Sequence, residues 1–205
     1  MSNKFHKLAF TESVKAAQER YGSRRHYAKF EDEPATESNF TDAEADFIEQ
    51  MDGFYMATVS ETGQPYIQFR GGKPGFLKVL DHQTLGFADL RGNLQYISVG
   101  NLNANANAAL FLMDYANRRR LKIMVTVEVK EAADVPELIE KLRVDGYKAK
   151  IERAFILHLK AFDWNCPQHI TPKFTAVQIR NAVSSLQDRI EELERENKEL
   201  KAERK

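Results

Sequence analysis

Donor side chains gather after one short apolar run of the chain. Residues 85–88 read as a buried strand, residues 89–93 as a polar turn that contains glycine, and the residues after them as the start of a helix. At such a junction successive backbone N–H groups point outward with the positive end of the helix dipole behind them. This arrangement suits an anion, most often a phosphate. The side chains available to donate to a phosphate or a ring carbonyl are Arg91, Asn93, Tyr96, Ser98 and Asn101.

An ordinary tight turn is the alternative interpretation of this segment. Asp89 and Asn93 are residue types that hydrogen-bond their own backbone in turns, with no ligand involved. The residue types alone leave the two interpretations equally open, so the choice between them depends on the surrounding elements.

The composition excludes several classes of protein. Thirty Lys and Arg residues balance thirty Asp and Glu residues, so no overall field attracts nucleic acid or an anionic membrane. The single cysteine, Cys166, rules out a disulfide within the chain and suits a reducing compartment. The first residues show no apolar signal core, and no apolar run reaches membrane-spanning length. We expect a soluble, cytoplasmic protein.

The elements around the turn favour an α+β fold. Helices are expected at 11–21, from Thr41 to Gly53, where Thr41 and Glu44 have capping-box spacing, and at 134–144. Short strands at close spacing with turn signals between them favour an antiparallel barrel or sandwich. The strand-like segments are 54–60, 66–70, 76–80, 85–88, 108–113, 121–129 and 154–162.

The last thirty residues have the pattern of a coiled coil. Apolar residues and one asparagine alternate spacings of four and three: Ile179, Val183, Leu186, Ile190, Leu193, Asn197 and Leu200. Asn197 falls at an a position, where it favours a parallel dimer in register. Arg189 would face Glu194 of a partner, and Glu196 would face Lys201. A single amphipathic helix lying on its own domain is the alternative. The expected organisation is an arm at 1–40, a domain at 41–174 and a coiled-coil helix at 175–205.

Four blocks of the domain, at 57–72, 74–81, 85–102 and 109–122, resemble in order the pyridoxamine 5′-phosphate oxidase-like family of flavin-binding split barrels. The resemblance covers most of residues 45–170. The Phe-Ala-Asp-x-Arg-Gly-Asn motif at 87–93 and the segment 163–169 are similar to a subgroup described as flavin-nucleotide-binding proteins. The resemblance implies a six-stranded split barrel, a homodimer, and FMN in a cleft between the two subunits.

The resemblance also implies which positions would hold the cofactor. One strand would bring Gln68 and Arg70 to the flavin and the next would bring Lys78. The end of the following strand, with Phe87, Ala88 and Asp89, would border the ribityl and phosphate groups. The turn and helix start, with Arg91, Asn93, Tyr96 and Ser98, would hold the phosphate. Two regions of the partner subunit would approach the ring, one around Arg120 and one with Trp164, Gln168 and His169.

Elementary chemistry agrees with these positions but leaves alternatives. Arg70, Lys78 and Arg91 could neutralise a phosphate, and segment 164–169 could supply a ring wall and donors. Lys78 could instead be a solvated strand residue, Trp164 a core residue and His169 a structural one. Cys166 and His169 alone do not make a zinc site, so we expect no metal. No dinucleotide-binding glycine fingerprint precedes a helix.

The sequence departs from the pattern of vitamin B6 oxidases in two places. A Gly/Pro loop separates Arg70 from Lys78, which are closely spaced on one strand in those enzymes, and the last residues have the coiled-coil pattern in place of a substrate-binding segment. We therefore expect little or no pyridoxamine-phosphate oxidase activity. Our first hypothesis is an FMN-dependent oxidoreductase of unknown substrate, with no side chain assigned a catalytic role. The second is a non-catalytic flavin-binding or redox-sensing module that uses its coiled coil for assembly. A third is haem binding, with His158 or His169 as axial ligand.

Overall fold

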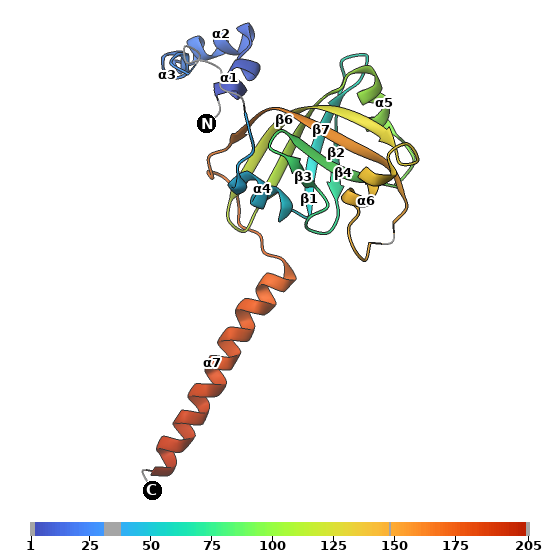
Figure 1. Cartoon of the computed structure of the whole chain (residues 1–205). Helices are drawn as coiled ribbons and strands as arrows, with labels where there is room; N and C mark the ends of the chain where they lie inside the picture. Colours follow the sequence, from blue (N-terminus) through green and yellow to red (C-terminus); the bar gives the residue numbers. More distant parts are fainter. Residues whose placement is uncertain (1–2, 31–37, 148, 204–205) are drawn as a thin grey trace. The chain divides into compact units, whose positions relative to one another are not determined.

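The structure is a computed structural model that describes residues 3–30, 38–147 and 149–203. It divides into two compact units. The first comprises Met1–Asp114 and Arg119–Pro167, and the second comprises Tyr115–Arg118 and Gln168–Lys205. The first unit contains a curled sheet with short helices, and the second contains one long helix (Figure 1).

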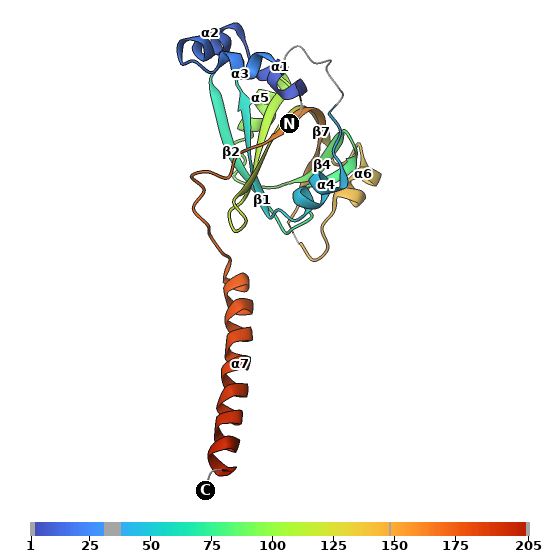
Figure 2. The ribbon, with the colours of Figure 1, turned by 90° about the vertical axis from the view of Figure 1, so that its left-hand side faces the viewer.

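The sheet contains seven strands, each antiparallel to its neighbours, in the order β2-β1-β5-β6-β7-β4-β3. The view in Figure 2 shows how the sheet curls round on itself. Within the described residues β2 and β3 are the two edges, so backbone pairing does not close the barrel. The strands are β1 Gly53–Val59, β2 Pro65–Gly71, β3 Lys78–Asp81, β4 Thr84–Leu90, β5 Asn107–Asp114, β6 Arg119–Glu131 and β7 Ile151–Trp164.

The expected α+β class and antiparallel sheet are therefore confirmed, while the strand count differs from the family-based expectation. The resemblance implied six strands, whereas the sheet has seven. Each of the seven strand-like segments in the sequence corresponds to one observed strand. The largest difference in bounds is at β7, which begins at Ile151 rather than at Ala154.

Seven helices accompany the sheet in the described residues. They are α1 Asn3–Ala9, α2 Glu12–Arg20, α3 Arg24–Ala28, α4 Asp42–Glu49, α5 Ile97–Ala104, α6 Pro136–Leu142 and α7 Ala176–Glu203. The capping box expected at Thr41 and Glu44 is present at the start of α4. After α2 the chain turns at Gly22, whose φ of 78° is favourable only without a Cβ. None of the helices in the described ranges is long and apolar enough to cross a membrane.

A stack of aromatic rings forms the middle of the core and supports the candidate site. Phe54 lies parallel to Phe76 and edge-on to Phe87, and Phe87 stacks on Phe155 with the ring centroids 4.9 Å apart. Phe54, Phe87 and Phe155 are almost fully buried, so these rings fix strands β1, β4 and β7 against one another. The rings of Phe87 and Phe155 also form the surface on which Arg70 rests.

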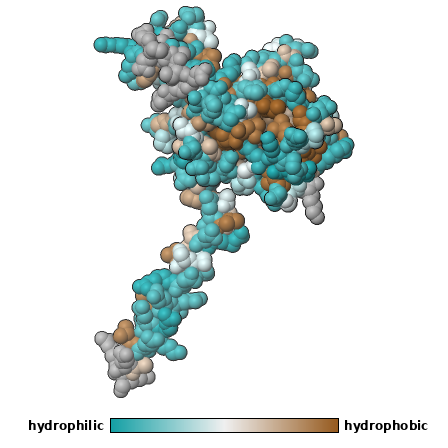
Figure 3. Space-filling view, in the orientation of Figure 1, coloured by the Kyte–Doolittle hydropathy of each residue, from teal (hydrophilic) through white to brown (hydrophobic). Residues whose placement is uncertain are grey.

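The second unit presents its apolar residues to solvent. Along α7 the seam residues from Ile179 to Leu200 are exposed, with exposed fractions between 43% for Val183 and 64% for Leu186. In Figure 3 the visible face of α7 is mostly hydrophilic and broken by separate hydrophobic spots. The structure confirms a long helix here, and the pairing of this helix stays a prediction.

Candidate functional site

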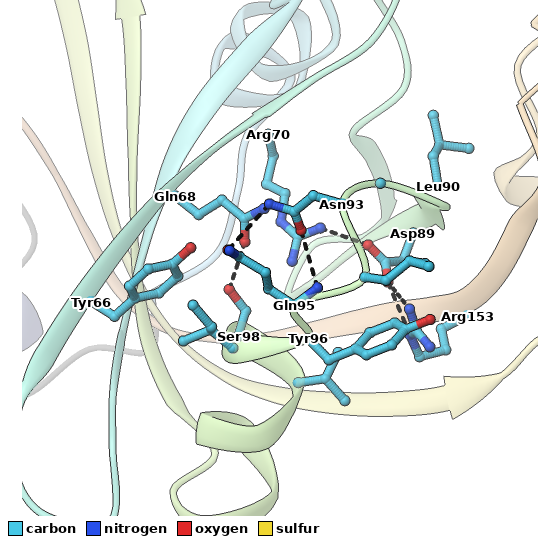
Figure 4. Close-up of a pocket in the computed structure, with 14 residues that line it drawn as sticks. Tyr66, Gln68, Arg70, Asp89, Leu90, Asn93, Gln95, Tyr96, Ser98 and Arg153 are labelled. Atoms are coloured by element: carbon cyan, nitrogen blue, oxygen red, sulfur yellow. Dashed lines mark hydrogen bonds and ion pairs between the residues drawn. The ribbon is translucent and has the colours of Figure 1, made fainter.

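A cavity of about 210 Å³ lies between strand β2, the end of β4 and the N-terminus of α5. Figure 4 shows polar side chains from these three elements pointing toward one another. Six residues expected to bind a cofactor line this cavity: Gln68, Arg70, Asp89, Asn93, Tyr96 and Ser98. The structure therefore brings together residues that the sequence separates by up to thirty positions.

Five charged side chains of alternating sign run through the cavity and along its rim. Arg70 donates to the Asp89 carboxylate at 2.6 Å, and Arg153 donates to the other oxygen of Asp89 at 2.9 Å. Arg153 also contacts Glu152 at 2.9 Å, and Glu152 lies 3.6 Å from Arg91. Three guanidinium groups against two carboxylates leave one net positive charge, which favours an anionic ligand. We call this set of side chains the charge ladder.

The centre of the charge ladder is buried. Asp89 is 3% exposed, and its Cα partner across the β4–β7 pairing is Arg153. Burial disfavours the charged form of Arg153, but hydrogen bonds and charges from Asp89 and Glu152 outweigh it and hold the pKa of that guanidinium above its ordinary value. Arg153 is therefore a fixed cation, locked to the sheet by two carboxylates.

The loop between β4 and α5 adopts a conformation that few non-glycine residues accept. Leu94 and Tyr96 have φ values of 65° and 51°, in the left-handed region. Such conformations cost of order 1–3 kcal/mol each and cluster at functional sites. The face of the Tyr96 ring lies 4.9 Å from the Arg153 guanidinium carbon, so this contact helps to hold the loop in its strained shape.

The loop aims the N-terminus of α5 at the cavity. Ile97, Ser98 and Val99 line the cavity, and the first backbone amides of a helix have no partner within it. Two side-chain hydrogen bonds fix the helix: Ser98 donates to Gln68 on β2 at 2.9 Å, and Asn101 donates to Thr58 on β1 at 3.0 Å. The first turn of α5 contains no acidic residue that would repel an anion.

The alternative of an ordinary tight turn is partly realised. Asn93 accepts a hydrogen bond from the backbone amide of Gln95 at 3.2 Å, as a turn residue does. Asp89 differs from the expectation, because it belongs to strand β4, which extends to Leu90, and binds Arg70 and Arg153 rather than its own backbone. A stable turn and an anion-suited cavity therefore coexist in one segment.

Four other expected cofactor-binding residues do not line this cavity. Phe87 lies in the core beneath Arg70, and Ala88 lines a different, small hollow next to α6. Lys78 begins the edge strand β3, where its Cα partner is Gly86. Arg91 lies on the rim, half exposed, with its backbone amide donating to the carbonyl of Lys150.

The residues expected to approach the ring from a partner subunit have contacts of different kinds. The indole N–H of Trp164 donates to Glu44 at 2.8 Å, and its ring packs edge-on against Phe47. Arg119 covers the rings of both Phe47 and Trp164. These contacts hold the Trp164 ring against α4 and Arg119 of its own chain. Nε of Arg120 is a buried donor with no acceptor among the described residues. Gln168 and His169 belong to the second unit.

Two members of the charge ladder were not anticipated from the sequence. Glu152 and Arg153 are the second and third residues of β7. The strand expected there began at Ala154, one residue after Arg153. In the observed register Arg153 lies opposite Asp89. The available signal was the pair of unlike charges next to an apolar strand, which by itself is common on protein surfaces.

The donor set of the cavity fits an oxyanion better than a metal ion. Guanidinium groups, a hydroxyl and helix amides donate hydrogen bonds, whereas metal ions require oxygen, nitrogen or sulfur ligands that accept them. Nε of Arg70 is a buried donor without an acceptor among the described residues. In the part of the chain that the structure describes, no three side chains of His, Cys, Asp or Glu are grouped as metal ligands would be.

The curled antiparallel sheet, with a donor-rich cavity at the N-terminus of a helix, places the protein among the split barrels. Within that class, the family model described as pyridoxamine 5′-phosphate oxidase matches residues 40–165. The chain belongs to the pyridoxamine 5′-phosphate oxidase family.

Solved structures agree with this fold. A candidate pyridoxamine 5′-phosphate oxidase from Lactobacillus delbrueckii is similar with a TM-score of 0.50 and 17% identity, covering 62% of this chain and 96% of that one. HupZ of Group A Streptococcus is similar with a TM-score of 0.50 and 18% identity, covering 66% of this chain and 99% of that one. At these identities the likeness concerns the fold alone. A comparison with curated proteins gave no match.

Proposed function

We propose that the protein binds FMN, with the phosphate of the cofactor at the N-terminus of α5. The observation that carries the proposal is the convergence of Arg70, Arg153, Ser98 and the first amides of α5 on one cavity. A dianionic phosphate is stabilised by cations, by hydrogen-bond donors and by the positive end of a helix. Membership of the pyridoxamine 5′-phosphate oxidase family supports a flavin as the molecule that bears this phosphate.

The size of the cavity supports a homodimer. Sites for whole small molecules usually enclose about 300–1,000 Å³, and this one encloses about 210 Å³, so one chain would surround only part of a flavin nucleotide. On β2 the side chains alternate: Gln68 and Arg70 line the cavity, whereas Ile67 and Phe69 between them are exposed. Exposed apolar side chains on a cavity-forming strand suit burial against a second copy.

The bound flavin would supply the chemistry by accepting and passing on a hydride or electrons. The residues of the chain would bind the phosphate, orient the cofactor and exclude water. The proposed activity is therefore that of an oxidoreductase whose substrate is a small organic molecule or a reduced nicotinamide. No side chain of the cavity is assigned an acid or base role.

The test of cofactor binding is the visible absorption spectrum of the purified protein, followed by mass analysis of the ligand that heating releases. An oxidised-flavin spectrum and the mass of FMN are the expected results. A colourless protein that does not bind added FMN would overturn the proposal.

The phosphate position is tested by Arg70→Ala. This change removes a charge-assisted donor, so we expect the Kd for FMN to rise roughly 10- to 100-fold. Asp89 stays paired with Arg153 in the variant, which limits damage to the fold. The matched control is Arg143→Ala, which removes an exposed arginine that pairs with Glu140 on α6. Equal affinities for Arg70→Ala and the control would show that the phosphate lies elsewhere.

A flavin-binding module without turnover is the second candidate function. The exposed seam of α7 favours it, because an assembly helix of this kind has no evident use in catalysis. The two candidates differ in stopped-flow experiments with reduced nicotinamides and oxygen. Repeated turnover supports the oxidoreductase, whereas a single slow stoichiometric reduction supports the module.

A further inference from the structure

The long helix α7 carries an apolar stripe that nothing in the described chain covers. The helix has 28 residues, which corresponds to a length of about 42 Å. Its seam residues Ile179, Val183, Leu186, Ile190, Leu193 and Leu200 are all more than two-fifths exposed. Helices of this kind gain most of their stability from packing an amphipathic face, so the stripe needs an occupant.

The shape of the stripe fits another helix of the same kind. A shallow hollow on α7 is lined by Ile190, Leu193 and Asn197 and flanked by Glu194, Lys198 and Lys201. Holes formed by seam residues with charged residues beside them receive the knobs of a facing helix in a coiled coil. β-branched residues at two of the a positions, Val183 and Ile190, and leucines at most d positions favour two strands rather than three or four.

The charges and Asn197 distinguish a parallel pair from an antiparallel one. In a parallel pair each Arg189 faces Glu194 of the partner and each Glu196 faces Lys201 of the partner, and no like charges meet. The two antiparallel registers with the greatest overlap each combine unlike and like pairs. One sets Arg180 opposite Glu194 but two copies of Arg189 opposite each other, and the other sets Arg189 opposite Glu196 but Arg180 opposite Lys201. Only the parallel register sets unlike charges opposite each other throughout.

Asn197 also favours the parallel pair. In a parallel pair Asn197 meets Asn197 of the partner, and the two amides can hydrogen-bond. In both antiparallel registers it meets an aliphatic side chain and its buried amide loses a partner, which is costly.

We propose that α7 pairs with α7 of a second copy of this chain as a parallel, two-stranded coiled coil in register. This interface consists of the second unit alone and does not depend on flavin binding or on contacts of the sheet. The charged pairs beside the seam set the direction of the pair, and Asn197 sets its register.

Disulfide trapping tests the direction. In a Cys166→Ser background, which removes the exposed native thiol, Leu200→Cys places a thiol on the seam. In a parallel pair the two thiols meet at the helix–helix axis within reach of a disulfide. In either antiparallel register they lie more than about 20 Å apart. Lys198→Cys is the matched control, because residue 198 faces outward in the same turn.

The full chain is equilibrated in glutathione buffers and the covalent dimer is quantified on non-reducing gels. The expected result is an effective thiol concentration for Leu200→Cys at least tenfold above that for Lys198→Cys. Equal values for the two variants, or no covalent dimer with Leu200→Cys, would overturn the proposal.

A charge-swap cycle on the Leu200→Cys background tests the register. Glu196→Lys and Lys201→Glu each set like charges across the parallel pair, so each should lower the effective concentration roughly three- to tenfold, and the double variant should restore it. Within one helix both swaps relieve like charges, because Glu196 lies near Glu192 and Glu199, and Lys201 lies near Lys198. A loss in the single variants must therefore arise from the partner.

Matched controls carry the same changes in charge at outward positions of α7, namely Asp188→Lys and Lys198→Glu, and neither adds net repulsion within its own helix. They should leave the effective concentration within twofold of the parent. A double variant as weak as the single ones, or controls as weak as the swaps, would contradict the proposed pairing.

Discussion

Two ion pairs in this protein have the same length and very different surroundings. Arg70 and Asp89 are 2.6 Å apart, with side chains 14% and 4% exposed. Lys130 and Glu128 on β6 are also 2.6 Å apart, with side chains 43% and 46% exposed. Because water screens the second pair and hardly reaches the first, distance alone does not tell how much either contributes.

The difference lies in what happens when one partner is lost. A carboxylate removed from the buried pair leaves guanidinium groups without compensation in a region of low polarity, which is strongly unfavourable. A carboxylate removed from the exposed pair leaves an ammonium group in water. The buried centre of the charge ladder is therefore sensitive to the loss of Asp89. The guanidinium groups that Asp89 fixes are suited to hold a ligand in one position.

The largest expected effect follows from Asp89→Asn. The change keeps the shape of the side chain and removes the charge between Arg70 and Arg153, so we expect the free energy of unfolding to fall by about 3 kcal/mol. Urea unfolding followed by the fluorescence of Trp164, the single tryptophan, measures this at fixed protein concentration. A loss below about 0.5 kcal/mol, typical of surface substitutions, would show that water screens the ladder as it screens an exposed pair.

An intermediate effect is expected at Glu44, which is buried and has no cation as partner among the described residues. Burial raises the pKa of its carboxyl, but hydrogen bonds from Thr41 and Trp164 outweigh this and hold the pKa below the ordinary value of 4.5. The carboxylate then contributes stability above pH 4.5, which is lost as the pH falls through the lowered pKa. Glu44→Gln should cost about 1–2 kcal/mol at pH 7.

The pH dependence separates this explanation from a loss of packing. The difference in unfolding free energy between the wild type and Glu44→Gln should stay constant above pH 4.5 and shrink below it. Urea titrations at several pH values measure the difference. A difference that is the same at every pH would mean that shape, rather than charge, accounts for the effect.

The sequence predicts the elements of this protein better than the contacts between them. Seven strand-like segments correspond to seven strands because alternation of apolar residues is a local property of each segment. The family resemblance implied six, so the local pattern was the better guide here. The heptad pattern of α7 is equally local, and the long helix follows from it.

The charge ladder was only half predicted, because it depends on register. The expected strand at β7 began at Ala154, one residue too late to include Arg153, and the expected strand at β4 ended one residue before Asp89. Both expected strands stopped one residue short of the pair, so the cross-strand contact between Asp89 and Arg153 was missed. Trp164 differs for another reason: its partner Glu44 lies 120 positions away, and nothing local in either segment indicates the contact.

The smallest effect is expected for Glu128→Gln, and it completes the comparison with Asp89→Asn. Both changes remove one carboxylate from an ion pair of the same length. The hydrogen bond from Lys130 holds the pKa of Glu128 below its ordinary value, yet both side chains are exposed, so water replaces most of what the pair provides. The urea midpoint should therefore match that of the wild type within the spread of repeat measurements, at low and at high salt alike. A loss comparable to that of Asp89→Asn would mean that the length of an ion pair, rather than its burial, sets its contribution in this protein.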